Sequence, residues 1–162
     1  MVTVVYSSRS GSSEAYAKHI ATSLGSKCFS IKEVSKDLDD QILYVGWISG
    51  ARVVGLNKVG DMKLKAVVVV GIEPESRFEK VKVTNYNKIR VPIFYLRGWI
   101  DRSKLNVFQK ILFAVIAAKI KMGGLNQYNQ PIFDAMMEGG SFYDESSAED
   151  VIRFIGTGQQ KS

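Results

Sequence analysis

The 162-residue sequence is poor in the residues that build disulfides, metal sites and hydrolytic centres. Its single cysteine, Cys28, can form no internal disulfide, which fits a reducing compartment. Its single histidine, His19, belongs to no group of His, Cys and Asp with the spacing of a metal site. One cysteine and one histidine also argue against a hydrolytic triad. We therefore expect no metal, and no catalytic residue can be named.

Long apolar runs are missing as well. The longest lies within Ile111–Ile120, far short of the roughly 20 residues that a membrane span needs. Val2–Tyr6 has the pattern of a strand from the first residues, which predicts that there is no signal peptide. The length suits one domain, 1–162, and we expect a cytoplasmic location.

The charge is positive and uneven. The formal net charge is +6 and the pI is about 9.4. Basic residues dominate Arg52–Lys104, whereas Asp134–Asp150 holds six acids and no base. Two interpretations stay open: a solvated basic surface, or a docking face for an acidic partner or a peripheral membrane surface. No DNA- or RNA-binding motif is present, so we expect no nucleic-acid partner, and the oligomeric state stays open.

The apolar pattern alternates between strands and helices, which predicts an α/β fold with a doubly wound, five-stranded parallel sheet. The predicted strands are Val2–Ser7, Cys28–Val34, Gln41–Ile48, Lys65–Ile72 and Val91–Leu96. The predicted helices are Ser12–Ser26, Glu75–Val83, Ser103–Met122 and a last one with a capping box from Ser146 to Glu149 and an end at Gly156. Val53–Met62 stays open between a short helix and an irregular crossover, and Leu125–Gly140 is predicted to be a loop with a helical turn.

Two of these helices have apolar faces that we expect to be buried. In the long helix the face consists of Leu105, Phe108, Leu112, Val115 and Ile116. In the last helix it consists of Val151, Ile152, Phe154 and Ile155. The tail Thr157–Ser162 is predicted to fray.

The loop after the first strand reads Ser8-Arg9-Ser10-Gly11-Ser12-Ser13, and a helix starts inside it. Helix starts offer free N–H groups and a partial positive charge, which bind anions. The hydroxyls of Ser8, Ser10, Ser12 and Ser13 add donors, and Gly11 lets the backbone approach closely. The alternative is that the serines simply cap the helix. No Gly-Lys-Ser/Thr ending is present, so this is not a nucleoside-triphosphate loop.

This loop resembles the phosphate loop of the flavodoxins, Ser/Thr-x-Thr-Gly-x-Thr, at Ser8, Ser10, Gly11 and Ser13. The resemblance implies a flavodoxin-like three-layer α/β/α fold and a bound flavin mononucleotide (FMN) whose phosphate the loop wraps. Arg9 holds a variable position of the motif; it either points outward or lends charge to the phosphate.

Two further loops follow strands at the same sheet edge, where ligands of doubly wound sheets bind. The first contains Gly46, Trp47, Ile48 and Ser49, and the second contains Leu96, Arg97, Gly98 and Trp99. Flavodoxins hold the flavin ring between loops in these places, so the resemblance makes the two tryptophans candidate stacking partners. The alternative is that both tryptophans pack against helices.

A closer resemblance lies in Phe94-Tyr95-Leu96-Arg97-Gly98-Trp99-Ile100-Asp101, followed by Lys104-Leu105. It is similar to a segment of the "flavodoxin domain" proteins, which include relatives of the menaquinone-dependent protoporphyrinogen oxidases. Trp99 stands where that group often has a second glycine. The segment from Gly46 to Gly50 likewise resembles their third-strand loop.

These features lead to a redox hypothesis, in which FMN passes electrons to a redox partner protein or a quinone. A nearby Arg52 or Arg97 would stabilise the negative charge of reduced flavin and raise its potential. Two alternatives stay open: an FMN-dependent oxidoreductase of the protoporphyrinogen oxidase type, and a flavin-free binding module on the same fold.

Overall fold

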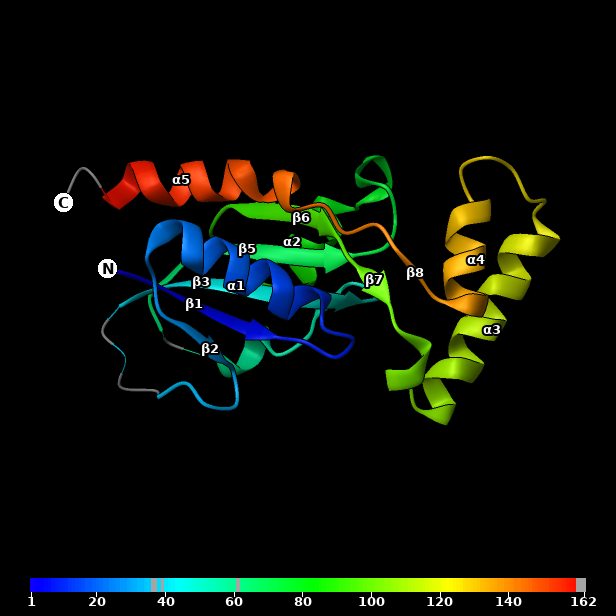
Figure 1. Cartoon of the computed structure of the whole chain (residues 1–162), viewed down its shortest axis with the longest axis horizontal. Helices are drawn as coiled ribbons and strands as arrows, with labels where there is room; N and C mark the ends of the chain where they lie inside the picture. The colour runs from blue at the N-terminus through cyan, green and yellow to red at the C-terminus, as the bar shows by residue number, and fades with distance from the viewer. Residues whose placement is uncertain (36–37, 39, 61, 160–162) are drawn as a thin grey trace.

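The computed structural model describes residues 1–35, 38, 40–60 and 62–159. Within these residues, eight strands and five α-helices follow one another along the chain (Figure 1). The strands are β1 (Val2–Ser7), β2 (Cys28–Ser30), β3 (Gln41–Ser49), β4 (Arg52–Val53), β5 (Leu64–Gly71), β6 (Ile93–Arg97), β7 (Trp99–Ile100) and β8 (Gly140–Ser141). The helices are α1 (Ser12–Leu24), α2 (Lys80–Asn87), α3 (Val107–Met122), α4 (Gln130–Glu138) and α5 (Glu149–Gln159).

The main sheet has the strand order β2-β1-β3-β5-β6, and these five strands are parallel. Numbered along the chain as the five parallel strands, the order is 2-1-3-4-5, which is the flavodoxin-like order. This confirms the predicted fold class. The short β4 adds an antiparallel pair to β3, and β7 and β8 form a second, two-stranded sheet.

Helices cover both faces of the main sheet because its strands are apolar on both sides. On one face α1 and α5 pack on side chains that include Val4, Leu43 and Val68. On the other face α2 and the turn after β4 cover the alternate residues of the same strands, which include Val5 and Tyr44. The side chains of neighbouring strand residues point to opposite faces, so each strand contributes to both cores.

The first strand and the start of the first helix lie where the sequence predicts them. The helix ends at Leu24 because Gly25 takes a left-handed conformation with φ of 61°. The second strand is shorter than predicted: it ends at Ser30, whose carbonyl accepts hydrogen bonds from the N–H groups of Glu33 and Val34 in a turn.

Two helix predictions in the middle of the chain are wrong in their bounds, and one region predicted as a loop with a helical turn holds a full helix. The helix predicted at 75–83 is split, because Phe78 is extended between a 3₁₀ turn and α2. The long helix starts at Val107 and not at Ser103, because Asn106 forms a capping box with Gln109. The region predicted as a loop contains α4, with a proline in its first turn and buried Ile132, Ala135 and Met136.

The predicted buried face of the long helix is wrong at Phe108, Leu112 and Val115, which are exposed. Its other two residues, Leu105 and Ile116, do pack on the core cluster, and α3 meets α4 through a side that overlaps the predicted face only at Ile116. That side consists of the buried Ala117 and the half-buried Phe113, Ile116 and Ile120. The helix is apolar around most of its circumference, so periodicity did not decide which side is buried.

The last helix buries Val151 and Ile155 as predicted, but its ends differ. Asp144 accepts from the N–H of Ser146 and caps a 3₁₀ turn there, so Ser146 does not cap α5. The helix continues through Gly156 to Gln159, so the start of the predicted tail is helical. Residues 160–162 lie outside the described part of the chain.

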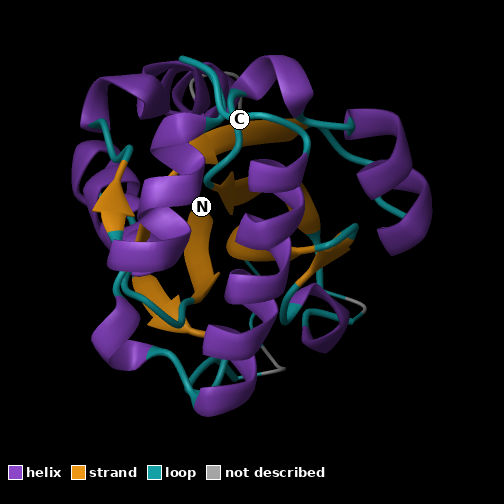
Figure 2. Ribbon diagram, turned by 90° about the vertical axis from the view of Figure 1, so that its right-hand side faces the viewer, coloured by secondary structure: helices purple, strands orange, loops and turns teal. Residues whose placement is uncertain are grey.

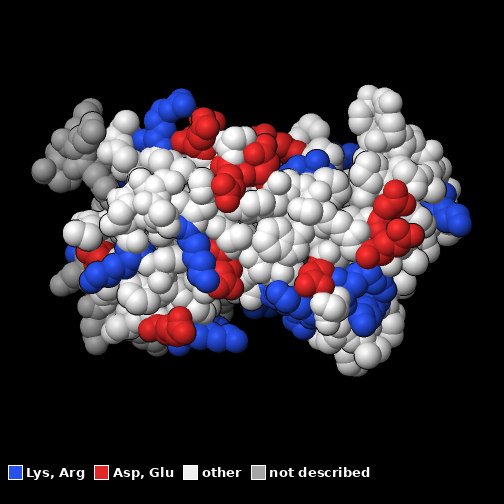
Figure 3. Space-filling model, viewed as in Figure 1, with Lys and Arg blue, Asp and Glu red and all other residues white. Residues whose placement is uncertain are grey.

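The α3–α4 pair extends beyond the carboxyl ends of the main strands (Figure 1) and lies in front of them when viewed along the sheet (Figure 2). It shares a third core cluster with Ile100 of β7. Among the described residues, no helix combines the length and the apolar character that crossing a membrane requires. Acidic side chains gather where the chain enters α5 (Figure 3).

Candidate functional site

The loop between β1 and α1 lies at the point where the strand order reverses, next to β3. Gly11 is the N-cap residue of α1 and has φ of 104°, a conformation that favours glycine. The Ser8 hydroxyl accepts the N–H of Gly11 at 3.1 Å and so shapes the turn before the helix. No side chain caps the start of α1. The interpretation of the serines as helix caps is therefore wrong.

Several hydrogen-bond donors at this helix start have no acceptor. The side chains of Ser12 and Ser13 are buried, and the Ser13 hydroxyl has no hydrogen-bond partner among the described residues. Nor does any acceptor in the described ranges take the N–H groups of Ser12, Ser13 and Glu14. Buried polar groups are normally satisfied, and an orphaned one often marks a missing ligand or water. An anion placed here would meet the free amides and the positive end of the helix dipole.

The segment after β6 covers this loop, which brings two of the three predicted windows together. The Trp99 indole N–H donates to the Ser10 carbonyl at 2.7 Å, and the Ser10 hydroxyl donates to the Trp99 carbonyl at 3.1 Å. Gly98 lies so close to Ser12 that a Cβ on it would lie 2.8 Å from the Ser12 Cβ. Glycine at 98 is thus required by close packing against the start of α1.

Trp99 therefore lies on the phosphate-binding candidate loop itself. A Cβ on Gly11 would be 3.2 Å from the indole, and the indole also packs edge-to-face with Tyr143 at a centroid distance of 5.2 Å. Sequence reasoning did not select Tyr143, because it lies more than 40 residues away along the chain. Burial, together with the nearby Glu145 carboxylate, raises the pKa of Tyr143 to about 12. Its hydroxyl is therefore neutral near pH 7.

Two cations flank the loop differently. Arg9 is exposed and has no ion pair within the described chain, so the outward orientation considered from the sequence is the observed one. Lys104 lies 3.5 Å from the Ser10 carbonyl and near Gly11, and it was not among the predicted site residues. The only sequence signal for Lys104 is its place in the segment that resembles the "flavodoxin domain" proteins.

The predicted site residues at the end of β3 lie on both faces of the sheet. Ile48 packs with the core on the α2 face, and strand alternation turns Trp47 to the opposite face, that of α1. Trp47 is paired in register with Val70, which lies under Gly98, so Trp47 is on the same side as the covered loop. Gly46 is buried, and Ser49 is exposed where the chain turns into β4.

The remaining residues of the window after β6 have structural contacts. Leu96 is buried in the core under α1 and α5. The Arg97 guanidinium donates two hydrogen bonds to the Ile72 carbonyl and lies 3.9 Å from the centre of the Phe142 ring. Arg97 thus ties the ends of β5 and β6 to the chain entering α5, whereas Arg52 lies exposed on β4.

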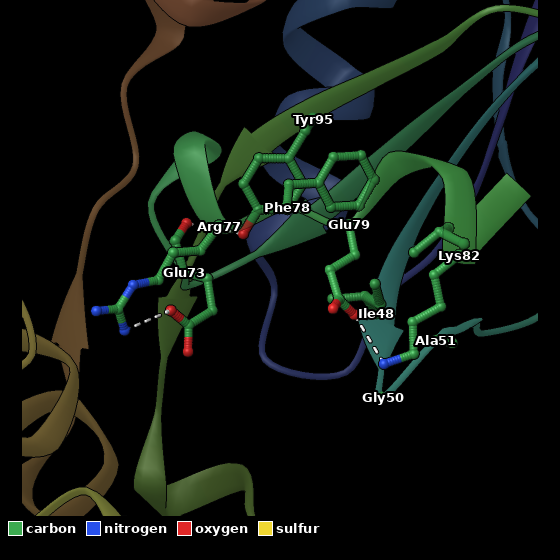
Figure 4. Close-up of a pocket in the computed structure, with 10 residues that line it drawn as sticks. Ile48, Gly50, Ala51, Glu73, Arg77, Phe78, Glu79, Lys82 and Tyr95 are labelled. Atoms are coloured by element: carbon green, nitrogen blue, oxygen red, sulfur yellow. Dashed lines mark hydrogen bonds and ion pairs between the residues drawn. The ribbon is translucent and has the colours of Figure 1, made fainter. Parts of the chain in front are cut away.

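A cleft of about 320 Å³ lies on the α2 side of the same sheet edge (Figure 4). Phe78 and Tyr95 stack in it with ring centres 4.4 Å apart, and Ile48 forms another part of its wall. Two ion pairs are found among its lining residues, Arg77 with Glu73 and Lys82 with Glu79. Burial raises the Tyr95 pKa. The lining includes no residue of the loop Ser8–Ser13.

The donor set at the start of α1 fits a phosphate monoester. It combines unpaired backbone amides, the buried Ser13 hydroxyl and the nearby Lys104 ammonium group. No carboxylate forms a hydrogen bond to the loop Ser8–Ser13 within the described chain, and Glu14 forms an ion pair with Lys18 at 2.6 Å. In comparison with known proteins, neither a family model nor a curated protein matches the sequence.

Proposed function

We propose that this protein is a flavodoxin-like FMN protein that transfers electrons. The observation that carries the proposal is the unsatisfied helix start: among the described residues, the buried Ser13 hydroxyl has no partner and the first amides of α1 have no acceptor. A phosphate monoester supplies the acceptors that this site lacks, and a helix start at the switch point of such a sheet is a common place to bind one.

The protein's part in this function is to bind and position the cofactor. Ser13 and the amides of Ser12 and Glu14 would hold the phosphate, and Lys104 would add positive charge beside it. Trp99 keeps the loop in shape through its bonds to Ser10. FMN, when bound, would supply the one- and two-electron chemistry of the reaction.

The flavin ring needs a flat apolar contact and an edge with hydrogen-bonding groups. We assign Trp47 and Trp99 to this contact with the flavin ring, because both aromatic side chains lie on the α1 side of the edge where the strands end. The positive charge of the chain favours reduced flavin, so we expect a potential less negative than that of an acidic flavodoxin. The electron acceptor would be a redox partner protein or a quinone.

The test compares FMN with riboflavin, which has the same ring and no phosphate. Purified protein is titrated with each compound, and binding is followed by quenching of flavin fluorescence. If the loop binds phosphate, FMN binds at least tenfold more tightly than riboflavin, because hydrogen bonds to a charged group contribute about 1.5–3 kcal/mol each. Absence of FMN binding would favour the flavin-free binding module. Equal affinity for the two compounds would contradict the assignment of the loop.

A second measurement addresses the reaction. The FMN-loaded protein is mixed with a porphyrinogen and an oxidised quinone as the electron acceptor, and oxidation of the porphyrinogen is followed by absorbance. Oxidation of more than one porphyrinogen per bound FMN would favour the oxidoreductase alternative over an electron carrier. A redox titration of the same sample measures the potential. A value as negative as that of an acidic flavodoxin would contradict the expected effect of the positive charge.

A further inference from the structure

The helix α3 has a broad apolar face that nothing in the described chain covers. Its large exposed side chains are 49–88% accessible. They are Val107, Phe108, Ile111, Leu112, Val115 and Met122. With about 100° between successive residues, these positions span about 140° of the helix circumference. Folded proteins seldom expose such a continuous apolar strip unless it is an interaction surface.

The apolar face is directed away from α4. The side of α3 that packs on α4 carries Phe113, Ile116, Ala117 and Ile120, which are opposite the exposed strip on the helical wheel. The acids of α4, Asp134 and Glu138, are therefore separated from the strip by the body of α3. Further exposed apolar side chains, Leu125 and Tyr128, follow at the turn that joins the two helices.

The charged side chains of α3 itself are all basic. The stretch from Arg102 to Phe133 contains no aspartate or glutamate. It contains five bases, Arg102, Lys104, Lys110, Lys119 and Lys121. An amphipathic helix with a wide apolar face, lysines beside it and no acids is typical of helices that lie in the interface of an anionic lipid bilayer.

Charge also argues against a second copy of this chain as the occupant. Two α3 faces brought together would place the lysines of one copy near those of the other, with no acid on either helix to neutralise them. A lipid surface with anionic headgroups neutralises the same lysines while its acyl region accepts the apolar side chains. Tyr128 at the turn has the mixed polar and apolar character found at the membrane interface.

We propose that the exposed face of α3 docks the protein onto the surface of an anionic lipid membrane. Phe108, Leu112 and their neighbours enter the headgroup boundary, and the lysines of α3 contact the headgroups. The segment just before α3 contacts the candidate phosphate loop, because the Lys104 ammonium group lies 3.5 Å from the Ser10 carbonyl. Docking would thus hold the sheet edge with that loop near the membrane. This last consequence rests on the proposed function, whereas the docking itself does not.

The test is sedimentation with lipid vesicles in the absence of FMN. Wild-type protein is expected to sediment with vesicles of phosphatidylcholine and phosphatidylglycerol, and to stay in solution with phosphatidylcholine alone. Added salt should weaken the binding, because it screens charges near the surface. The double variant Phe108→Ser/Leu112→Ser should bind at least tenfold more weakly, because it removes two large side chains that would be buried in the lipid.

A charge variant, Lys119→Gln/Lys121→Gln, should also bind at least tenfold more weakly, because each lysine near an anionic surface contributes about fivefold. Matched controls lie on α2, which is on another face of the molecule. Val81→Ser/Tyr86→Ser removes two equally exposed apolar side chains, and Lys80→Gln/Lys82→Gln removes two exposed charges. Both control variants should bind like the wild type. All these positions are exposed, so thermal unfolding should show every variant folded.

Several results would overturn the docking proposal. One is wild-type protein that does not sediment with anionic vesicles, and another is equal binding to both kinds of vesicle. A third is α3 variants that bind like the wild type or no more weakly than the α2 controls. A dimer in analytical ultracentrifugation that Phe108→Ser/Leu112→Ser dissociates would assign the face to a second copy instead. Wild-type protein that binds anionic vesicles but no FMN would refute the proposed function and leave docking intact, so the two proposals fail separately.

Discussion

Replacing Ser13 by alanine should stabilise the protein without FMN and weaken its binding of FMN. Both effects follow from the same group, because the buried Ser13 hydroxyl has no partner in the described chain. A buried polar group without a hydrogen bond costs about 1–3 kcal/mol, and alanine removes it without adding volume. If a phosphate oxygen is its partner in the complex, the same change removes one hydrogen bond to a charged group.

The two magnitudes are measurable. For a chain of this length, each 1 kcal/mol of free energy of unfolding moves the melting temperature by about 2–4 °C. The Ser13→Ala variant should therefore melt at least about 2 °C higher than the wild type without ligand. A hydrogen bond to a charged group contributes about 1.5–3 kcal/mol, which is about a 10- to 150-fold change in Kd for FMN. The Kd for riboflavin, which lacks the phosphate, should not change.

Ser26 provides the matched control for this experiment. Its hydroxyl is also buried without a partner among the described residues, but it follows the other end of α1. Ser26→Ala should raise the melting temperature and leave the Kd for FMN unchanged. Circular dichroism follows unfolding, and flavin fluorescence follows binding. The reasoning is refuted if Ser13→Ala lowers the melting temperature without ligand, or if both variants change FMN affinity equally.

Three further predictions concern the surroundings of the loop. Gly98→Ala should lower the melting temperature by about 2–12 °C, because its Cβ would overpack against Ser12 at a cost of about 1–3 kcal/mol; Gly123→Ala, where there is room, should not lower it. Tyr16→Phe should destabilise by about 2 kcal/mol in urea unfolding, since the Tyr16 hydroxyl donates to one backbone carbonyl at 2.6 Å and accepts from a backbone N–H at 3.1 Å; unchanged unfolding would contradict this. The Glu14 carboxylate has a pKa below its usual 4.5, chiefly through its hydrogen bond with a lysine. The ionised carboxylate therefore stabilises the folded protein above pH 4.5, and this contribution is lost as the pH falls through the lowered pKa. When the pH falls from 6 to 3, the melting temperature of Glu14→Gln should therefore fall less than that of the wild type, because glutamine has no carboxylate to protonate. An identical fall in the two proteins would count against this prediction.

The sequence predicted the fold because its apolar pattern is strong where the fold is decided. Val67–Val70 is apolar without interruption, as a strand covered on both faces must be, and it lies in the centre of β5. The helix start at Ser12 was also predictable, since a strand, a glycine and a polar loop precede it. The predicted ends of helices were wrong where a local capping residue competes with the periodic apolar pattern, as at Asn106 before α3.

The candidate site was predicted only in its first part. The loop Ser8–Ser13 is contiguous, so its donors could be recognised from the residue types alone. Trp47 and Ile48 are also adjacent in the chain, but they lie on opposite faces of the sheet. The sequence of the segment Gly46–Ser49 alone did not show that only one of them faces the candidate loop. Lys104 and Tyr143 reach the loop only through the path of the chain after β6.

By itself the sequence determined the order along the chain of the five parallel strands, the position of the hydroxyl-rich loop and the excess of positive charge, because each depends on residues that are neighbours in the chain. The tertiary structure alone decided that Gly98 and Trp99 cover that loop, since this contact joins residues almost 90 positions apart. It also decided which side of α3 is exposed. That helix is apolar nearly all round, so the choice was made by the position of α4 and not by the pattern.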